Sequence, residues 1–288
     1  MEAALHELPL ALFTTLASIG AGAFIALAVA FFKTSFTEEK ARAIDKITLV
    51  PTIVVLVGFV AAFFHLANPM NAMNVFAGIG RSPLSNELCV ASLFAAAMVV
   101  YAILAVMGKL NEGSRKGFLA VLAVLAVAFA AAMGMAYSLP TVPTWDSPWP
   151  ICQMLGYALL GGAVMGTCVL AFAGALDDAL SAGFKSVALG LGVVGFVLAI
   201  LGLAMMVSGA NGMETAIASG AALVGEAMGC LVVAIVGLAG AFGVLFKVLG
   251  DGGDAKSLAA VAVALALVGT LAGRFVFYIL YLSVGIFF

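Results

Sequence analysis

The stretch "ITLVPTIVVLVGFVAAFFHL", from Ile47 to Leu66, decides the fold of this chain. Over its 20 residues it carries no Asp, Glu, Lys or Arg, and that length is what an α-helix needs to cross the hydrocarbon core of a bilayer. Its one ionisable side chain, His65, stands at the end of the run, just before the proline-marked turn "LANPM". The stretch therefore predicts a membrane-spanning helix that ends with a histidine at the membrane boundary.

Composition extends this prediction to the whole chain. Hydrophobic residues make up 65% of the 288 residues, charged residues only 9%, and the mean hydropathy is +1.25, far from the balance of a soluble domain. A transmembrane β-barrel would need strands that alternate polar and apolar residues, whereas these runs are apolar on every face. We expect an all-α integral membrane protein, a single polytopic domain over residues 1–288 with eight transmembrane helices. The predicted spans are 8–32, 47–66, 88–107, 118–137, 151–176, 184–207, 221–249 and 258–287.

Glycine spacing bears on how these helices meet. The pairs Gly162–Gly166 and Gly225–Gly229 have the GxxxG spacing that lets helix backbones approach closely in lipid. Glycine is also common in membrane helices, so chance spacing is an equally good interpretation of each pair.

The basic residues predict the orientation. Ten of the 12 Lys and Arg residues fall on the connections of one side, the opposite connections hold only Arg81, and Arg274 lies inside the last span. The positive-inside rule then places both termini outside the cytoplasm. The first eight residues hold two glutamates and no basic residue, unlike a secretory signal peptide, so we expect the first helix to be retained. The ten are Lys33, Lys40, Arg42, Lys46, Lys109, Arg115, Lys116, Lys185, Lys247 and Lys256.

Cysteine usage argues against a metal or iron–sulfur site on this chain. The four cysteines are scattered over three predicted helices with no C-x-x-C pair, whereas such sites draw on closely spaced cysteines. A disulfide between Cys89 and Cys152 is conceivable, but inert buried thiols are the better interpretation. Phosphate-binding loops and nucleophile elbows are also missing from the sequence. We expect no metal and no bound cofactor on this chain.

A small set of polar residues is predicted on the outer side, where ionisable groups at membrane depth indicate function. His65 ends the second span and Glu87 opens the third, so the two side chains can face one pocket. Glu87 also has a structural interpretation, because Ser85 can cap the helix and a carboxylate suits its first turn; His65 can be a satisfied interfacial histidine. The set comprises His6, Glu7, His65, Asn68, Arg81, Asn86, Glu87, Asp146, Glu214, Glu226 and Arg274.

Five short segments, in the same order along the chain, resemble the membrane anchor subunit family of dimethyl sulfoxide reductase. They are "HELPLALFTTL" (6–16), "HLANPMNAMN" (65–74), "PLSNEL" (83–88), "TVPTW" (141–145) and "GRFVFY" (273–278). The resemblance implies a haem-free, eight-helix anchor in the bacterial cytoplasmic (inner) membrane, which oxidises menaquinol near the outer face. It also implies an iron–sulfur partner with [4Fe-4S] clusters and a molybdopterin catalytic subunit, both on the outer face. No nucleic-acid partner is expected.

The resemblance also implies site residues. The family's quinol-site histidine corresponds to His65 and its carboxylate to Glu87, and we expect these two to be the catalytic residues. The chain departs from the family at Asn71, where a basic residue is common, and at Tyr281, where a histidine is expected; Arg81 can replace the lost basic residue. The expected quinol-binding residues are His65, Asn68, Arg81, Ser85, Asn86 and Glu87.

The chemistry of a quinol explains a histidine beside a carboxylate. Two protons must leave with the two electrons, so the site needs a base whose pKa lies near the working pH, and histidine meets this need without tuning. Glu87 can pass the proton on or hold the imidazole in a useful tautomer. The terminal acceptor and the particular quinone are not specified by this chain.

Other functions remain open as alternatives. A polysulfide-reductase-type anchor shares eight helices and quinol use. A secondary transporter would place its site near the bilayer midplane, often within an internal repeat. A haem cytochrome usually needs axial histidines, and both histidines of this chain lie on the predicted outer side. For Trp145 and Trp149, contact with lipid headgroups and contact with a partner subunit are both open.

Overall fold

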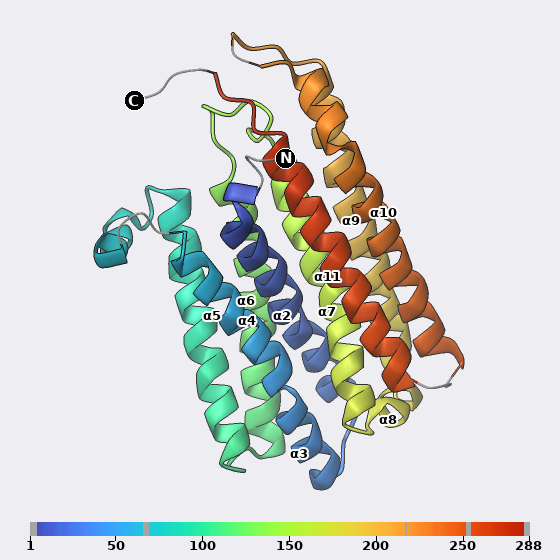
Figure 1. Ribbon diagram of the computed structural model, residues 1–288. Helices are drawn as coiled ribbons and strands as arrows, with labels where there is room; N and C mark the ends of the chain where they lie inside the picture. Colours follow the sequence, from blue (N-terminus) through green and yellow to red (C-terminus); the bar gives the residue numbers. More distant parts are fainter. Residues whose placement is uncertain (1–4, 66–68, 217, 252–254, 285–288) are drawn as a thin grey trace.

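The computed structural model describes residues 5–65, 69–216, 218–251 and 255–284. Within these residues, eight helical segments are long and apolar enough to span a membrane, as predicted (Figure 1). Seven are single helices: α2 (Leu8–Lys33), α5 (Pro83–Val106), α6 (Glu112–Ala136), α7 (Trp149–Phe172), α9 (Phe184–Asn211), α10 (Gly220–Asp251) and α11 (Ala255–Ile279). The eighth combines α3 (Glu38–Ile47) with α4 (Leu49–Phe63). Two short elements were not predicted, the 3₁₀-helix η1 (Pro69–Gly78) and α8 (Leu176–Ser181).

Successive spans run in opposite directions, so α2 begins and α11 ends at the same end of the bundle (Figure 1, top). We call this the terminal end, and the other, which carries α3 and α8, the α3 end. The ten basic residues that predicted the orientation all lie on segments at the α3 end. Their one-sided distribution is therefore a property of the fold, and the side of the membrane that each end faces stays a prediction.

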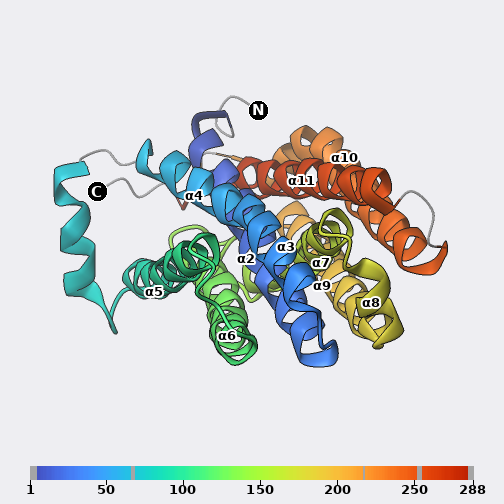
Figure 2. The ribbon, with the colours of Figure 1, turned by 90° about the horizontal axis from the view of Figure 1, so that it is seen from below.

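Helices α2 and α7 form the centre of the bundle (Figure 2). In each of them, 78% of the residues in the most apolar window are buried, against 22–50% in the other six spans. α2 packs against α4, α6, α7 and α11, and α7 also packs against α9. The outer helices turn apolar side chains outward, as expected for surfaces that face lipid.

Small residues allow α2 and α7 to pack backbone to backbone. A Cβ atom on Gly22 would overlap the carbonyl of Ala158, and one on Gly162 would overlap the backbone of Gly22. The prediction of close approach is thus confirmed for the pair Gly162–Gly166. It is wrong, within the described residues, for Gly225 and Gly229, since a Cβ at either position would have no neighbour within 4 Å.

Proline chemistry explains two helix boundaries that differ from the predictions. α3 and α4 are separated at Thr48 because Pro51 has no N–H to donate to the carbonyl of residue 47. α5 begins at Pro83, five residues before the predicted start, where Ser82 accepts a hydrogen bond from the Ser85 backbone N–H at 3.5 Å. Ser82, rather than Ser85, is therefore the capping residue.

The last span is shorter than predicted because the chain turns away from the helix after Ile279. The segment that follows packs against the loop between α6 and α7: the Thr144 hydroxyl donates to the Leu280 carbonyl at 2.6 Å and the Val284 N–H donates to the Thr141 carbonyl at 3.2 Å. The disulfide considered between Cys89 and Cys152 is not formed, since both are free thiols.

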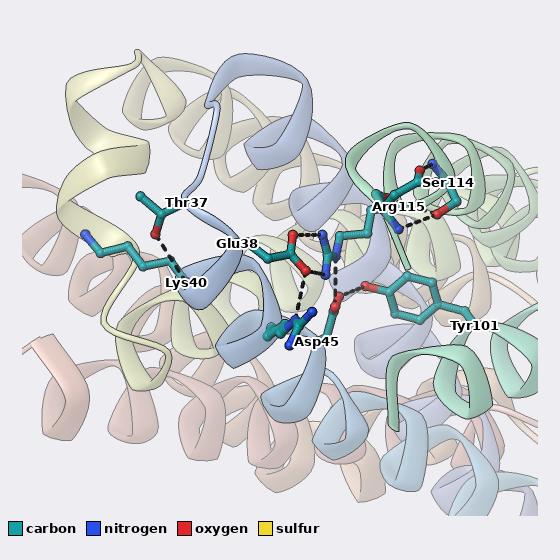
Figure 3. A network of polar contacts seen from close by, with 9 residues as sticks. Thr37, Glu38, Lys40, Asp45, Tyr101, Ser114 and Arg115 are labelled. Carbon is teal, nitrogen blue, oxygen red and sulfur yellow. Dashed lines mark hydrogen bonds and ion pairs between the residues drawn. The ribbon is translucent and has the colours of Figure 1, made fainter. Parts of the chain in front are cut away.

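A buried ionic network joins three spans at the α3 end (Figure 3). Arg115 of α6, only 1% exposed, donates through Nε to Asp45 at 2.8 Å and through both terminal nitrogens to Glu38 at 2.9 and 3.0 Å. The Tyr101 hydroxyl of α5 donates to the other Asp45 oxygen at 2.8 Å. On its other side α3 is linked to α8, because Lys40 contacts Asp178 at 2.6 Å. The charged side chains of α3 thus hold this helix between α5 and α6 on one side and α8 on the other.

Candidate functional site

A cleft of about 560 Å³ opens at the terminal end, between the start of α2 and the ends of α6 and α11. Its volume falls within the roughly 300–1,000 Å³ of small-molecule sites. It is bordered mainly by aromatic and polar side chains, which suits a flat aromatic ring that carries oxygen substituents. The lining residues are His6, Glu7, Leu10, Ala136, Tyr137, Leu139, Trp145, Tyr278 and Tyr281.

One wall of the cleft is a pair of tyrosines with an arginine behind it. The hydroxyls of Tyr137 and Tyr278 lie 2.8 Å apart, and Arg274 donates through Nη2 to the Tyr278 oxygen at 3.1 Å. Arg274 is fully buried, and its Nε donates to the Thr14 hydroxyl at 2.8 Å. The guanidinium carbon also lies 4.1 Å from the ring centre of Phe277, a cation–π distance. A buried positive charge is therefore fixed directly behind the phenol groups.

Trp145 completes this wall from the loop between α6 and α7. Its ring stacks on Phe277 with centres 4.4 Å apart, and its indole N–H donates to the Phe277 carbonyl at 3.0 Å. The side chain is only 7% exposed. Both interpretations of Trp145 from the sequence, contact with lipid headgroups or with a partner subunit, are thus wrong for this residue, which packs inside the chain and lines the cleft. Trp149 begins α7 and is partly exposed.

His65 lies beside the cleft, at the end of α4. Its Nδ1 atom is 3.7 Å from Glu7 Oε2, and both side chains are more than a third exposed. Because Glu7 lines the cleft, His65 is connected to it through this carboxylate. The structure therefore places the predicted catalytic histidine next to the carboxylate of the residue that precedes α2.

Glu87 occupies a different environment, inside the first turns of α5. Its side chain is buried in the bundle, with only 4% of its surface exposed. Among the described residues, no hydrogen bond or ion pair joins Glu87 to His65. The structure thus places the two predicted catalytic residues in the same terminal region, one buried and one at the surface.

The other predicted quinol-binding residues shape the turn between η1 and α5. Arg81 donates through Nη2 to the Ala77 carbonyl at 2.9 Å, and the Asn86 side-chain oxygen accepts from the Gly80 N–H at 2.7 Å. Ser85 is buried in the first turn of α5. None of the three lines the cleft, and Asn68 lies outside the described residues.

Several cleft residues were not predicted as site residues from the sequence. Tyr137, Tyr278 and Leu10 are apolar or weakly polar residues in helical runs, and only the fold brings them to one cavity. The segment "GRFVFY" carries the family resemblance, but no pattern in it predicts that Arg274 is enclosed by aromatic rings. Within the described residues, no group of three or more His, Cys, Asp or Glu side chains could hold a metal ion.

Fold and site together define a polytopic helical membrane protein with a polar, aromatic cleft at one end of its bundle. Comparison with known sequences shows the family: residues 1–280 match the family described as DMSO reductase anchor subunit (DmsC), and the protein belongs to it. The sequence is 33% identical to the C subunit of the anaerobic dimethyl sulfoxide reductase of Escherichia coli (strain K12), over 97% of this chain and 96% of that protein.

Two further relatives match over shorter stretches. The YnfH subunit of an anaerobic dimethyl sulfoxide reductase of Escherichia coli (strain K12) is 31% identical over 57% of this chain and 58% of its own length. The C subunit of the anaerobic dimethyl sulfoxide reductase of Haemophilus influenzae is 27% identical over 59% of this chain and 61% of its own length. The resemblance inferred from the five short segments is thereby confirmed.

Proposed function

We propose that this chain oxidises menaquinol as the membrane anchor subunit of a multi-subunit anaerobic reductase. The observation that carries the proposal is the pairing of His65 with Glu7 at the edge of an aromatic cleft. The cleft opens where α2 begins and α11 ends, at the boundary of the apolar spans. A lipid-soluble quinol can place its ring there while its tail stays among the helices.

The residues at the cleft edge supply the proton chemistry. Oxidation of menaquinol to menaquinone releases two electrons and two protons, and a neutral imidazole accepts a proton near neutral pH. His65 is exposed enough to pass a proton to water, and the Glu7 carboxylate lies 3.7 Å from its Nδ1 atom. Glu87 is the buried carboxylate of the same region and the candidate for a second acceptor. The candidates for further contacts to the quinol remain Asn68, Arg81, Ser85 and Asn86.

The electrons then leave the chain. We propose that they pass to an iron–sulfur subunit with [4Fe-4S] clusters, docked at the terminal end, and from there to a molybdopterin catalytic subunit. That subunit would reduce dimethyl sulfoxide or a related S- or N-oxide, a proposal supported by the family and by the names of the relatives.

The orientation supports the same arrangement. All ten basic residues of the connections lie at the α3 end, so the positive-inside rule places that end in the cytoplasm. The terminal end, with its cleft and its partners, then faces the outside of the bacterial cytoplasmic membrane.

The test is His65→Gln in the assembled complex, because glutamine keeps similar bulk and hydrogen bonding but cannot act as the base. We expect quinol-driven turnover to fall roughly 10²- to 10⁴-fold, the range for loss of a general base. Glu87→Gln should impair the same step, more mildly if the carboxylate only orients other groups.

Turnover driven by an artificial dye that donates directly to the partner subunits is the control, and it should stay near normal in both variants. Normal quinol-driven turnover in an assembled His65→Gln complex would show that the histidine is only an interfacial residue.

A further inference from the structure

Tyr137 and Tyr278, in the wall of the cleft, carry two hydroxyl protons between them. The hydrogen bond that joins the two hydroxyls uses only one of these protons. A phenol has one proton to donate and two lone pairs to accept with, and the Tyr278 oxygen already accepts from Arg274 at 3.1 Å. If Tyr137 donates across the 2.8 Å contact, both lone pairs of Tyr278 are used and its own proton is left over; if Tyr278 donates, the proton of Tyr137 is left over. Because both residues line the cleft, either arrangement leaves a donor on the cleft wall.

Arg274 is expensive to bury, and packing alone does not account for it. A guanidinium taken out of water loses several kcal/mol of hydration unless it is well paired, yet no carboxylate among the described residues lies within the 4.0 Å of an ion pair with it. Its other terminal nitrogen, Nη1, has no hydrogen-bond partner among the described residues. Three aromatic rings surround the charge instead, those of Tyr137, Phe277 and Tyr278. This arrangement supplies a positive potential to the phenol pair.

We propose that the spare phenol proton of the Tyr137–Tyr278 pair binds a ring oxygen of the quinol, with Arg274 as the positioning residue behind it. This inference rests on the proposed function. The ring then lies between a donor wall, made by the two tyrosines, and an acceptor wall, made by Glu7 and His65. As the quinol loses both protons and the first of its two electrons, the remaining negative charge is shared between the two ring oxygens. A phenol donor backed by a fixed positive charge stabilises that charge without having to reorganise.

The spacing of four residues between Arg274 and Tyr278 supports this donor wall. That spacing puts both side chains on one face of α11, so the Nη2–hydroxyl bond forms within a single helix and is set before any ligand arrives. The ring stacked on Phe277 belongs to Trp145, which forms a flat apolar surface beside the donor. A bicyclic naphthoquinol matches this combination of a flat surface and one directed donor.

The experiment measures menadiol-driven and dye-driven turnover of the assembled complex in membranes. Tyr137→Phe and Tyr278→Phe, singly and together, keep the rings and remove only the hydroxyls. The matched control is Tyr157→Phe, because this buried tyrosine of α7 has no hydrogen-bond partner in the described part of the protein and does not line the cleft. In the double variant we expect kcat/KM for menadiol to fall roughly 10- to 100-fold, the cost of losing a hydrogen bond to a charged group. Dye-driven turnover should be unchanged, and Tyr157→Phe should stay within about twofold of the parent protein.

A second comparison tests the role of Arg274. If Arg274 acts through the phenol pair, Arg274→Gln should lower kcat/KM for menadiol on its own but cause no further loss in the double Tyr→Phe background. An arginine needed only for structure would cause an additional loss there, and that result would overturn its positioning role.

The two proposals can fail separately. Normal menadiol kinetics in the double Tyr→Phe variant, in a preparation where His65→Gln is impaired, would overturn the donor wall and leave the proposed function standing. Normal kinetics in both would overturn the proposed function as well. If membranes with Arg274→Gln show no dye-driven turnover, that complex has not assembled. The donor wall is then tested by the kinetics of the tyrosine variants alone.

Discussion

Removal of Arg115 should destabilise this protein more than removal of any exposed cation. In Arg115→Met the apolar stem of the side chain is retained, but Asp45, which is 2% exposed, keeps only the hydrogen bond from Tyr101. An uncompensated buried charge of this kind costs about 3–5 kcal/mol. The loss should reach three spans at once, since the pair joins α3 to α6 and the Tyr101 hydroxyl adds α5.

The neighbouring residue supplies a matched control. Lys116 lies on the same helix and forms an i,i+4 pair with Glu112 at 2.6 Å, but the Glu112 side chain is 66% exposed. Such surface pairs contribute about 0.3–0.5 kcal/mol. Lys116→Met should therefore cost less than about 1 kcal/mol, although it removes the same charge one position along the sequence.

The assay is unfolding of the purified protein in mixed micelles by titration with sodium dodecyl sulfate, followed by circular dichroism. The double variant Asp45→Asn, Arg115→Met should recover part of the loss, because neither buried charge is then left alone. Equal free energies of unfolding for Arg115→Met and Lys116→Met would refute the reasoning, since they would mean that water reaches Asp45 as freely as it reaches Glu112.

Two further predictions concern topology and packing. A reporter that is active only outside the cytoplasm should work when fused after residue 288 or within 140–149, and should fail within 34–45; the reverse pattern would place the cleft on the cytoplasmic side. Gly22→Ala should reduce folded protein in the membrane severely, because its methyl group overlaps the Ala158 carbonyl, while Gly225→Ala, with no neighbour within 4 Å, should express like the parent protein.

The apolar runs predicted the number of spans because each run is long enough to cross a bilayer by itself, without reference to its neighbours. The helical segment at 38–47 escaped prediction as part of a span because "EEKARAIDKI" is charged, and only its contacts with Arg115 and Tyr101 show that Asp45 is buried. The end of the last span was misplaced for the opposite reason. The apolar residues of the sequence continue to residue 288, which predicted a longer helix. The described segment after Ile279 instead forms hydrogen bonds with the loop at 138–148.

Glycine spacing also could not predict which helices pack closely. Gly162 and Gly225 begin identical GxxxG patterns, yet only the first faces another helix, because spacing describes one helix and does not include the partner's position.

The site was predicted in part. His65 and Glu87 were singled out by their position at the ends of apolar runs, and both lie in the terminal region. The pairing of His65 with Glu7 could not be predicted, because it depends on where α2 lies relative to α4. Tyr137 and Tyr278 are separated by 141 residues and meet only through the packing of α6 and α11 against the central helices.

The central position of α2 also has a consequence for synthesis and membrane insertion. Among the eight described spans α2 leaves the ribosome before the others, and α7, against which its glycine face packs backbone to backbone, is completed about 140 residues later. At about 5–20 residues per second, that interval lasts roughly 7 to 28 seconds. During this time the small-residue face of α2 has lipid, the insertion machinery or the earlier partner α4 as its neighbours, so one of the two most enclosed helices of the bundle must wait in the membrane for the helix that encloses it.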